Sequence, residues 1–563
     1  MIELYKKRLG DMLIIREYIT KEQLEEALAK QRLSGKRLGE ILIEEQYVTE
    51  EIILEALEYQ LGIERVNLES TVIDKEAVLL IPENIAVKYN LIPICVENDR
   101  IKVAMSDPLN IFAVDDVRIA SGYEVEPLIA TKAEVTDHIA KYYTNQSAQK
   151  AADELSKGVE RENSGKDGKD DEFDEVKNAP AVRLVESIIK AAVKDRASDI
   201  HIEPFEKYTK VRNRIDGELI ETMRTSKDVH GAVITRIKIL GNMNIAEKRI
   251  PLDGRILTKI DNIDVDLRVS TIPTIYGEKV VIRILRRDSF MFGKQEMGMR
   301  PDDLEKLERL TKNSYGILLA AGPTGSGKST TLYSILKDMN TPNKNIVTVE
   351  DPVEYMMEGV NQIGVNVKSG MTFAVGLRSI LRQDPDIIMV GEIRDSETAE
   401  IAIRAAITGH IVLSTVHTND APSTIIRLID MEIEPFLVAT SIVGVIAQRL
   451  VRKICNYCKE EYIASPEEKK ILGLPEVKKT ILYRGKGCPV CNDTGYFGRV
   501  GVYEIMEITK VHRQAIMNSK NADELRDISI RNGMKTLRMS CTESVLDGLT
   551  TIDELMRIAY LKE

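Results

Sequence analysis

A glycine-rich segment that ends in lysine and serine constrains this chain more than any other feature. It reads Gly-Pro-Thr-Gly-Ser-Gly-Lys-Ser and lies between a short apolar run, 315–321, and an amphipathic run, 330–337. A turn of this kind between a strand and a helix lets backbone N–H groups close around phosphate oxygens, and the helix N-terminus adds positive potential. Lys328 is then placed for the β- and γ-phosphates and Ser329 for Mg²⁺. The sequence predicts a nucleoside triphosphate site formed by Gly322, Pro323, Thr324, Gly325, Ser326, Gly327, Lys328, Ser329 and Thr330.

The length and the charge of the chain limit its class. With 563 residues, 43% of them hydrophobic and 30% charged, the chain is expected to form several soluble domains. We find no run that approaches the roughly 18 apolar residues of a membrane span, and no apolar core of a secretory signal at the N-terminus. The net charge of −11 argues against general nucleic-acid binding. We expect a cytoplasmic protein that meets a membrane only through partners.

Four of the six cysteines form a pattern typical of a metal site. They are arranged as C-x2-C, a gap, and a second C-x2-C, which suits a tetrahedral Zn²⁺ with four thiolates. Two disulfides or a redox pair are the alternatives, and disulfides are disfavoured in a chain without an export signal. The predicted zinc ligands are Cys455, Cys458, Cys488 and Cys491.

The N-terminal region contains a repeat with a period of 29 residues. Arg8-Leu-Gly-Asp-Met-Leu answers to Arg37-Leu-Gly-Glu-Ile-Leu, and matching Tyr, Thr, Ala, Leu and Gln residues follow each of them. Each copy is expected to contain a short helix, a turn, a threonine cap and a longer amphipathic helix. We therefore expect two stacked copies of one small helical unit.

Changes in composition suggest where the domains end. Residues 145–178 are polar and charged, too poor in apolar residues to offset the entropy of ordering, and predict a flexible linker. Beyond the linker we expect a helix over 182–197, a sheet with one polar face, and then alternating strands and helices around the glycine-rich segment. The predicted segments are 1–63 (helical repeat), 64–143 (small α/β), 144–179 (acidic linker), 180–290 (α/β), 291–450 (nucleotide-binding core), 451–499 (cysteine lobe) and 500–563 (helical).

Further polar clusters follow the glycine-rich segment along the chain. Glu350 ends a strand-like run, Glu392 follows the apolar run 387–390, and His417 ends a third run. In open α/β sheets ligands bind beyond the carboxyl ends of the strands, so we expect these side chains to converge on the γ-phosphate. Hydrolysis needs a group that orients water and oxygen ligands for Mg²⁺. Glu350 is favoured as the base and Glu392 for Mg²⁺, although the sequence leaves both open as the base.

These motifs resemble the secretion ATPases that drive type IV pilus assembly and type II secretion, over essentially the whole chain. The glycine-rich segment matches the family's Walker A motif, 348–354 its aspartate box, 386–392 its Walker B motif and 408–418 its histidine box. The resemblance implies an α/β multi-domain chain, with a RecA-like parallel-sheet core preceded by a PAS-like domain. It also implies a homohexamer that hydrolyses ATP, with an inner-membrane platform protein and cytoplasmic accessory proteins as partners.

The same resemblance implies roles for four arginines. Arg268 and Arg283 match a pair that the smaller domain closes on the phosphates, and Arg378 and Arg382 match a pair near the subunit interface. The cysteine lobe resembles that of the assembly and secretion branch, and the N-terminal repeat favours pilus assembly over type II secretion. A nucleotide-switched scaffold with little turnover is one alternative, and the acidic and arginine clusters argue against it. A nucleic-acid translocase is another, and the acidic balance, the absence of Trp and the position of the cysteine lobe argue against it.

The N-terminal repeat resembles a cyclic di-GMP-binding module of some of these ATPases. Arginine can stack on guanine or pair with phosphate, and glycine lets the backbone approach closely. The family pattern has a second glycine where this chain has Glu17 and Gln46, and Glu17 adds negative charge near a dianionic ligand. A helical docking module for a membrane partner is the alternative. The residues implied for cyclic di-GMP are Arg8, Leu9, Gly10, Arg37, Leu38 and Gly39.

Overall fold

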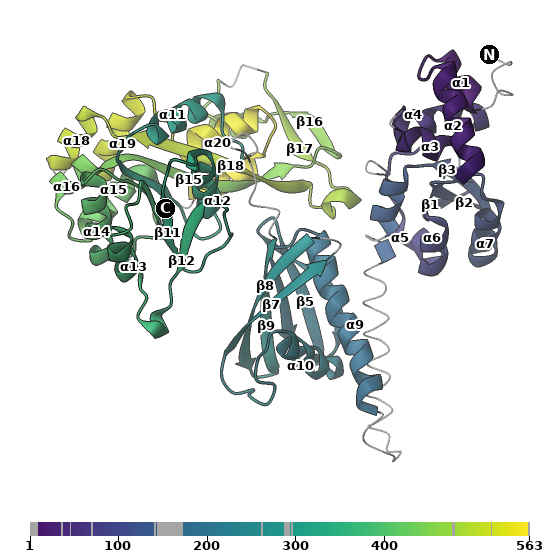
Figure 1. The fold of residues 1–563 in the computed structure, drawn as a ribbon, viewed down its shortest axis with the longest axis horizontal. Coiled ribbons are helices and arrows are strands. Elements are labelled where there is room, and N and C mark those ends of the chain that lie inside the picture. Colours follow the sequence, from purple (N-terminus) through teal and green to yellow (C-terminus); the bar gives the residue numbers. More distant parts are fainter. Residues whose placement is uncertain are drawn as a thin grey trace. The chain divides into compact units, whose positions relative to one another are not determined.

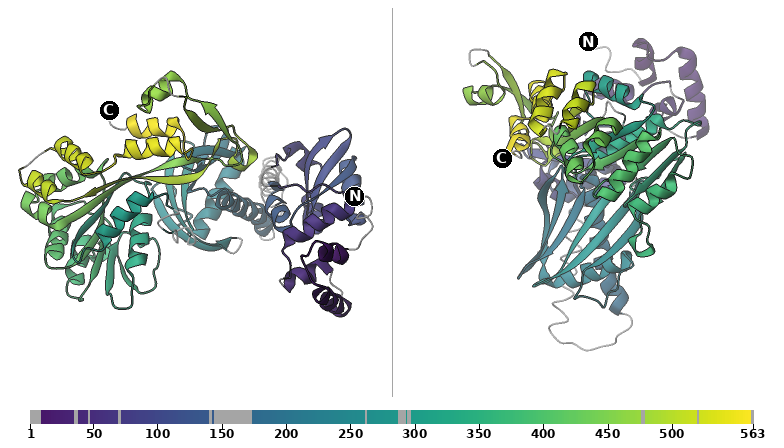
Figure 2. Two further views of the ribbon diagram at one scale, coloured as in Figure 1. Left: turned by 90° about the horizontal axis from the view of Figure 1, so that it is seen from above. Right: turned by 90° about the vertical axis from the view of Figure 1, so that its left-hand side faces the viewer.

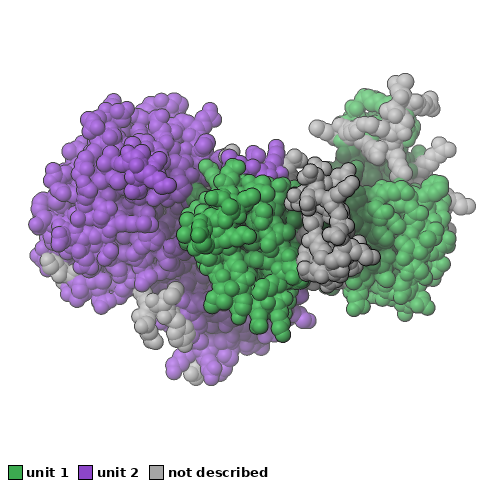
Figure 3. Space-filling model, turned by 90° about the horizontal axis from the view of Figure 1, so that it is seen from below, with its two compact units in different colours: residues 1–256, 267–284, 488–490 green, residues 257–266, 285–487, 491–563 purple. Residues whose placement is uncertain are grey.

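The computed structural model describes most of the chain as two compact units. One unit comprises residues 1–256, 267–284 and 488–490, and the other comprises 257–266, 285–487 and 491–563 (Figure 3). Every helix of the described part is too short or too polar to cross a bilayer. Most of the predicted linker, 144–172, lies outside the described residues. The described residues are 9–34, 38–45, 47–68, 71–139, 142–143, 173–260, 263–286, 293, 297–475, 479–518 and 521–560.

The N-terminal repeat forms two helical hairpins, as its sequence predicts. The helices are α1 (Leu9–Ile15), α2 (Lys21–Ser34), α3 (Leu38–Glu44) and α4 (Glu50–Leu61). The first short helix ends with Glu17 N–H donating to Ile14 O and Tyr18 N–H to Leu13 O, the two bonds of a Schellman motif. The second copy repeats the bond between residues five apart in sequence, with Tyr47 N–H donating to Leu42 O. Equivalent buried residues of both copies, such as Leu13 and Leu42, share one core.

The two copies are also linked reciprocally through equivalent polar residues. Tyr18 Oη donates to Glu55 at 3.5 Å, and Tyr47 Oη donates to Glu26 at 2.8 Å. Because position 18 corresponds to 47 and position 26 to 55, each copy makes the same contact with the other. Arg16 adds an ion pair with Glu55 at 2.6 Å. The repeat is therefore one pseudo-symmetric module.

A small α/β subdomain follows the repeat. Its three strands lie in the order β1-β2-β3, with β1 antiparallel to β2 and β2 parallel to β3. The two strands expected at 91–96 and 101–105 are confirmed as β1 and β2. The elements are α5 (Lys75–Leu79), α6 (Glu83–Tyr89), β1 (Leu91–Glu97), β2 (Arg100–Met105), α7 (Ile111–Ser121) and β3 (Glu124–Ile129).

The next domain is a six-stranded sheet with the order β6-β5-β4-β9-β8-β7. It follows a helix that begins at Phe173, earlier than the predicted start at 182, and that contains Pro180. Along β5 buried residues alternate with half-buried ones, which gives the sheet the polar face expected from its sequence. The elements are α9 (Phe173–Lys194), β4 (Asp199–Pro204), β5 (Tyr208–Ile215), β6 (Glu218–Ser226), α10 (His230–Leu240), β7 (Leu252–Ile260), β8 (Ile263–Thr274) and β9 (Gly277–Arg286).

The core of the second unit is a seven-stranded sheet in the order β12-β11-β13-β14-β10-β15-β18, in which β15 spans Ile442–Ile454 and β18 spans Tyr496–Glu507 (Figure 1). Strands β10 to β14 pair in parallel, and β15 is parallel to β10. One apolar cluster packs α13 to α16 with α18 (Lys510–Met517) and α19 (Ala522–Arg531), and another packs α11 and α12. The elements are α11 (Pro301–Thr311), β10 (Gly316–Ala321), α12 (Lys328–Met339), β11 (Ile346–Glu350), β12 (Val360–Gly364), α13 (Phe373–Ile380), β13 (Ile387–Val390), α14 (Ser396–Ile407), β14 (Ile411–Val416), α15 (Ala421–Asp430) and α16 (Pro435–Ser441).

The end of the chain differs in part from its expected structure. We expected helices from residue 500, but β18 (Tyr496–Glu507) pairs antiparallel with β15 (Ile442–Ile454) along nearly its whole length (Figure 2). The cysteine lobe is inserted between these two strands. Its elements are β16 (Lys459–Ile463), α17 (Pro466–Ile471) and β17 (Ile481–Gly485), and the helices that follow β18 are α18 (Lys510–Met517), α19 (Ala522–Arg531), α20 (Leu537–Leu546) and α21 (Ile552–Tyr560).

Candidate functional site

The glycine-rich segment connects β10 to α12, as its sequence predicts. Gly327 is the N-cap residue of α12 with a φ of 89°, a left-handed conformation that favours glycine. Lys328 Nζ donates to the carbonyls of Gly322 at 2.8 Å and Pro323 at 3.1 Å. Burial lowers the pKa of Lys328 to about 8, against the opposing attraction of Glu392. A buried cation and a helix N-terminus therefore meet in this loop, an arrangement suited to phosphate.

Ser326 provides a local test of whether the loop fits such a ligand. The residue is 3% exposed, and its hydroxyl oxygen has no hydrogen-bond partner among the described residues. Buried polar groups are normally hydrogen-bonded, so an unpaired hydroxyl in this loop is consistent with a ligand that provides the missing partner. The residues present fit a nucleotide phosphate.

Glu392 and His417 lie together at the edge of the sheet where the parallel strands β13 and β14 end. His417 Nε2 is 3.4 Å from Glu392 Oε2, and Arg394 Nε is 2.6 Å from the same oxygen. Burial, followed by repulsion from Lys328, lowers the pKa of His417. The lysine of the phosphate loop, the carboxylate of Glu392 and the imidazole of His417 therefore interact electrostatically with one another.

Glu350 ends β11 at the same edge, but its carboxylate is held by other partners. Thr348 Oγ1 donates to Oε1 at 2.6 Å, Gln362 Nε2 donates to Oε1 at 3.1 Å, and Tyr333 Oη donates to Oε2. Burial raises the pKa of Glu350, and the three hydrogen bonds oppose this effect. The predicted pair of acids thus occupies two different environments, one with Lys328 and one enclosed by neutral donors.

Gln448 and Arg449 of β15 contact the site but were missed by sequence reasoning. Gln448 Nε2 donates to Ser326 O at 2.7 Å, and Arg449 donates to both Asn419 O and Asn419 Oδ1. Gln448 follows Ala447, which pairs with Ala321 at the end of β10. Only this pairing brings position 448 beside the loop, so the local sequence around it carries no signal of the contact.

The four predicted arginines occupy two separate places. Arg283 of β9 pairs with Asp199 at 3.2 Å, and Arg268 lies half-buried on β8 of the same sheet. Arg378 of α13 pairs with Glu397 of α14 at 2.6 Å, and Arg382 donates to Arg378 O. The first pair therefore belongs to the smaller domain and the second to the surface of the nucleotide-binding core.

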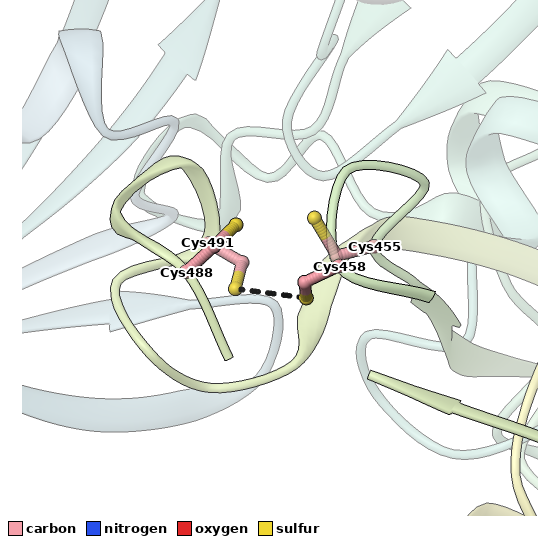
Figure 4. A group of neighbouring side chains, drawn as sticks. All are labelled: Cys455, Cys458, Cys488 and Cys491. Carbon is pink, nitrogen blue, oxygen red and sulfur yellow. Dashed lines mark hydrogen bonds between the residues drawn. The ribbon is translucent and has the colours of Figure 1, made fainter. Parts of the chain in front are cut away.

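The four predicted zinc ligands are brought together in the lobe. Their sulfur atoms all lie within 4.8 Å of one another, and the cysteines are free thiols (Figure 4). Cys458 Sγ and Cys491 Sγ are 3.9 Å apart. A tetrahedron with Zn–S bonds of about 2.3 Å separates its sulfurs by about 3.8 Å, so the donor set and spacing fit zinc.

The residues implied for cyclic di-GMP are only partly described. Arg8 and Arg37 lie outside the described residues, whereas the glycines pack against the second helix of their own copy. A side chain added at Gly39 would meet Ile53 at 3.2 Å, and one at Gly10 would meet Leu24 more closely. These glycines thus allow the two helices of each copy to approach each other closely. Leu9 and Leu38 pack on the shared core of the repeat.

Comparison with protein families identifies two regions of the chain. Residues 174–557 match the family described as "Type II/IV secretion system protein", and residues 61–149 match the MshEN domain. The second match covers the small α/β subdomain, and the helical repeat lies almost wholly before it. The structure of the ATPase DotB from Legionella pneumophila shares the fold, with a TM-score of 0.50 at 20% identity over 67% of this chain and 95% of that chain. The structure of DotB from Yersinia pseudotuberculosis does so with a TM-score of 0.51 at 21% identity over 67% of this chain and 93% of that chain.

Curated relatives match almost the full chain. The type IV pilus assembly ATPase PilB of Thermus thermophilus is 44% identical over 98% of this chain, which spans 66% of that protein's length. PilB of Myxococcus xanthus is 40% identical over 98% of both proteins. The type II secretion system protein E of Xanthomonas campestris is 42% identical over 84% of this chain and 83% of its own length. A parallel-sheet core, a phosphate loop and matches of this extent establish that the chain belongs to the type II/IV secretion system protein family.

Proposed function

We propose that this protein is an ATP-hydrolysing motor subunit that powers type IV pilus assembly. The observation that carries the proposal is the grouping of Lys328, Glu392 and His417 beside the phosphate loop, at the carboxyl edge of a parallel sheet. Proteins named as pilus assembly ATPases match 98% of the chain, whereas the Xanthomonas secretion protein matches 84% of it. Type II secretion, with assembly of a pseudopilus, is the second candidate because those relatives share the same core.

In this proposal the chain's own residues bind and orient the substrate ATP. Backbone N–H groups of the loop and Lys328 Nζ bind the phosphates, and the charge that develops there is stabilised in place because the groups are already oriented. Ser329 and Glu392 present the hydroxyl and carboxylate oxygens that suit Mg²⁺, which when bound would neutralise phosphate charge. Glu350 orients the attacking water, and His417 forms a hydrogen bond near the γ-phosphate.

The mechanical step is proposed to involve the smaller domain and neighbouring copies of the chain. Arg268 and Arg283 contribute positive charge that closes on the phosphates, and Arg378 and Arg382 act near the boundary between subunits of a hexamer. The partners proposed for this hexamer are a platform protein of the inner membrane and cytoplasmic accessory proteins, so that the chain lies at the membrane only through them. The lobe is proposed to bind one structural zinc, and the N-terminal region to bind cyclic di-GMP.

Replacement of the loop lysine tests the proposed activity. Lys328→Ala is expected to lower ATP turnover by at least about a hundredfold, because the removed cation contacts the transferred phosphate. Phosphate release by the purified full chain is the measurement, with circular dichroism as the check that the variant folds. The matched control is Lys337→Ala, which removes an exposed lysine from the same helix. Turnover that persists unchanged in Lys328→Ala would contradict the proposal. The variants Glu350→Gln and Glu392→Gln, assayed alongside for nucleotide binding and turnover, show which acid orients the water and which binds Mg²⁺.

A further inference from the structure

Tyr333 connects the phosphate-loop helix to the acid that ends β11. It lies five positions after Lys328 on α12, about 7–8 Å along the helix axis. The residue is 3% exposed, and its phenol donates to Glu350 Oε2. The backbone N–H of Tyr355 donates to the same phenol oxygen at 3.4 Å. One hydroxyl therefore links α12, Glu350 and the loop that follows β11.

The surroundings of this hydroxyl leave Glu350 little freedom. Gln362 Nε2 bridges Glu350 Oε1 and Tyr355 O, and Gln362 Oε1 accepts from Met357 N–H at 2.8 Å. Thr348 is fully buried and donates to Glu350 Oε1. The rings of Tyr333 and Tyr355 meet edge to face, with their centroids 6.4 Å apart. Among the described residues, Thr348 and Gln362 donate to Oε1, and Tyr333 donates to Oε2.

We propose that Tyr333 is a positioning residue for ATP hydrolysis, holding the Glu350 carboxylate in one orientation and coupling that orientation to the helix that begins at the phosphate loop. The inference rests on the proposed function, in which Glu350 orients the attacking water. A carboxylate that must accept a proton or align water depends on the direction of its oxygens, and small misplacements are costly. Tyr333 does not itself reach the reacting atoms in this proposal.

The electrostatics of the site give this role a distinctive signature. Burial and nearby Glu354 raise the pKa of Glu350, whereas Thr348, Tyr333 and Gln362 lower it by donating to the charged form. Burial and the same carboxylate raise the pKa of Tyr333, so the phenol stays protonated and remains a donor. Loss of the hydroxyl removes one donor to the ionised acid. The pKa of Glu350 must therefore rise, and the acidic limb of the activity profile must move to higher pH.

The first experiment compares Tyr333→Phe with the wild type, using the full chain. Phenylalanine keeps the ring and its contact with Tyr355 but removes the hydroxyl. We expect kcat to fall about tenfold, KM for ATP to stay within about twofold, and the acidic limb of kcat to shift upward by about one pH unit. The matched control is Tyr503→Phe, which removes a buried phenol that donates to Met297 O instead. That variant is expected to keep the wild-type profile.

A double-mutant cycle shows whether Tyr333 acts through Glu350. In a Glu350→Gln background, Tyr333→Phe is expected to lower kcat no further, because the group that it positions is already gone. The inference is wrong if the two losses in kcat multiply. It is also wrong if Tyr333→Phe keeps the wild-type kcat and pH profile. In either case, an inactive Lys328→Ala variant leaves the proposed function standing. If Lys328→Ala retains full turnover, the proposed function itself fails.

Thr348 provides an independent test should Tyr333→Phe fold poorly. Thr348→Val removes the second hydroxyl donor to Glu350, and Thr348→Ser retains it. We expect Thr348→Val to shift the acidic limb of the kcat profile to higher pH and Thr348→Ser to keep the wild-type profile. Loss of packing alone would not produce this pattern. Equal profiles for the two variants would contradict the idea that fixed donors set the behaviour of Glu350.

Discussion

Asp303 is an acid that the fold buries at the start of α11. Only 4% of its surface is exposed, and burial, followed by repulsion from Asp302, raises the pKa of its carboxyl to about 6. Lys306 and Lys535 act in the opposite direction without restoring the ordinary value of 3.8. A folded-state pKa above the unfolded one means that the folded protein binds more protons, so stability falls as pH rises between about 4 and 6.

Asp303→Asn is therefore expected to stabilise the second unit at neutral pH. The gain should be absent near pH 4, grow as pH rises to about 6 and then stay constant, reaching about 2–3 kcal/mol for a shift of about two pKa units. Thermal unfolding between pH 4.5 and 8 measures it. Exposed Asp430→Asn, which also removes one negative charge, is measured alongside it. A gain that is equal at all pH values would show that charge is not its cause.

Glu17 stands where the family pattern has glycine, and its backbone conformation explains that preference. Its φ of 59° places it at the left-handed position that ends a Schellman motif, where glycine is favoured. A side chain there costs on the order of 1 kcal/mol. The sequence identified this position as unusual, and the structure supplies a backbone reason for the glycine in the pattern. Gln46, the equivalent in the second copy, lies outside the described residues.

Among the elements, those around the phosphate loop could be predicted from local sequence and those at the end of the sheet could not. Apolar runs flanked by polar clusters predicted β10, β11, β13 and β14, because buried parallel strands read as continuous apolar segments. The pairing of β15 with β18 joins segments separated by the whole lobe. No local pattern specifies such a partner, and the strand over 496–507 was accordingly missed.

The cysteine lobe is the element whose stability is expected to depend on a metal. Cys458→Ser should reduce bound zinc from one per chain to none and lower the melting temperature of the second unit, because structural zinc contributes on the order of 10 kcal/mol to folding. Metal analysis of the purified full chain and thermal unfolding are the measurements. Cys95→Ser, which changes a cysteine of the small α/β subdomain, is the control. A wild-type chain purified without zinc would contradict the assignment.

At the scale of the whole molecule, the N-terminal module is proposed to bring a second messenger to the motor. Calorimetric titration of cyclic di-GMP into the full chain is expected to show saturable binding that Arg8→Ala and Arg37→Ala abolish. Glu17→Gly should tighten binding roughly threefold, because it removes a negative charge near a dianionic ligand. Glu124→Gln removes an exposed charge from the α/β subdomain and should leave the affinity unchanged. No heat in any variant would favour a docking module.

The sequence by itself determined the parts of this protein whose signals are local. Spacing within short segments specified the phosphate loop, the cysteine pairs and the repeat, because each depends on a few neighbouring residues in fixed order. Only the tertiary structure decided what surrounds them: Tyr333, Thr348 and Gln362 on Glu350, and Gln448 against Ser326. These contacts join side chains from different elements, and they exist because strand order and helix packing bring distant positions within hydrogen-bond reach.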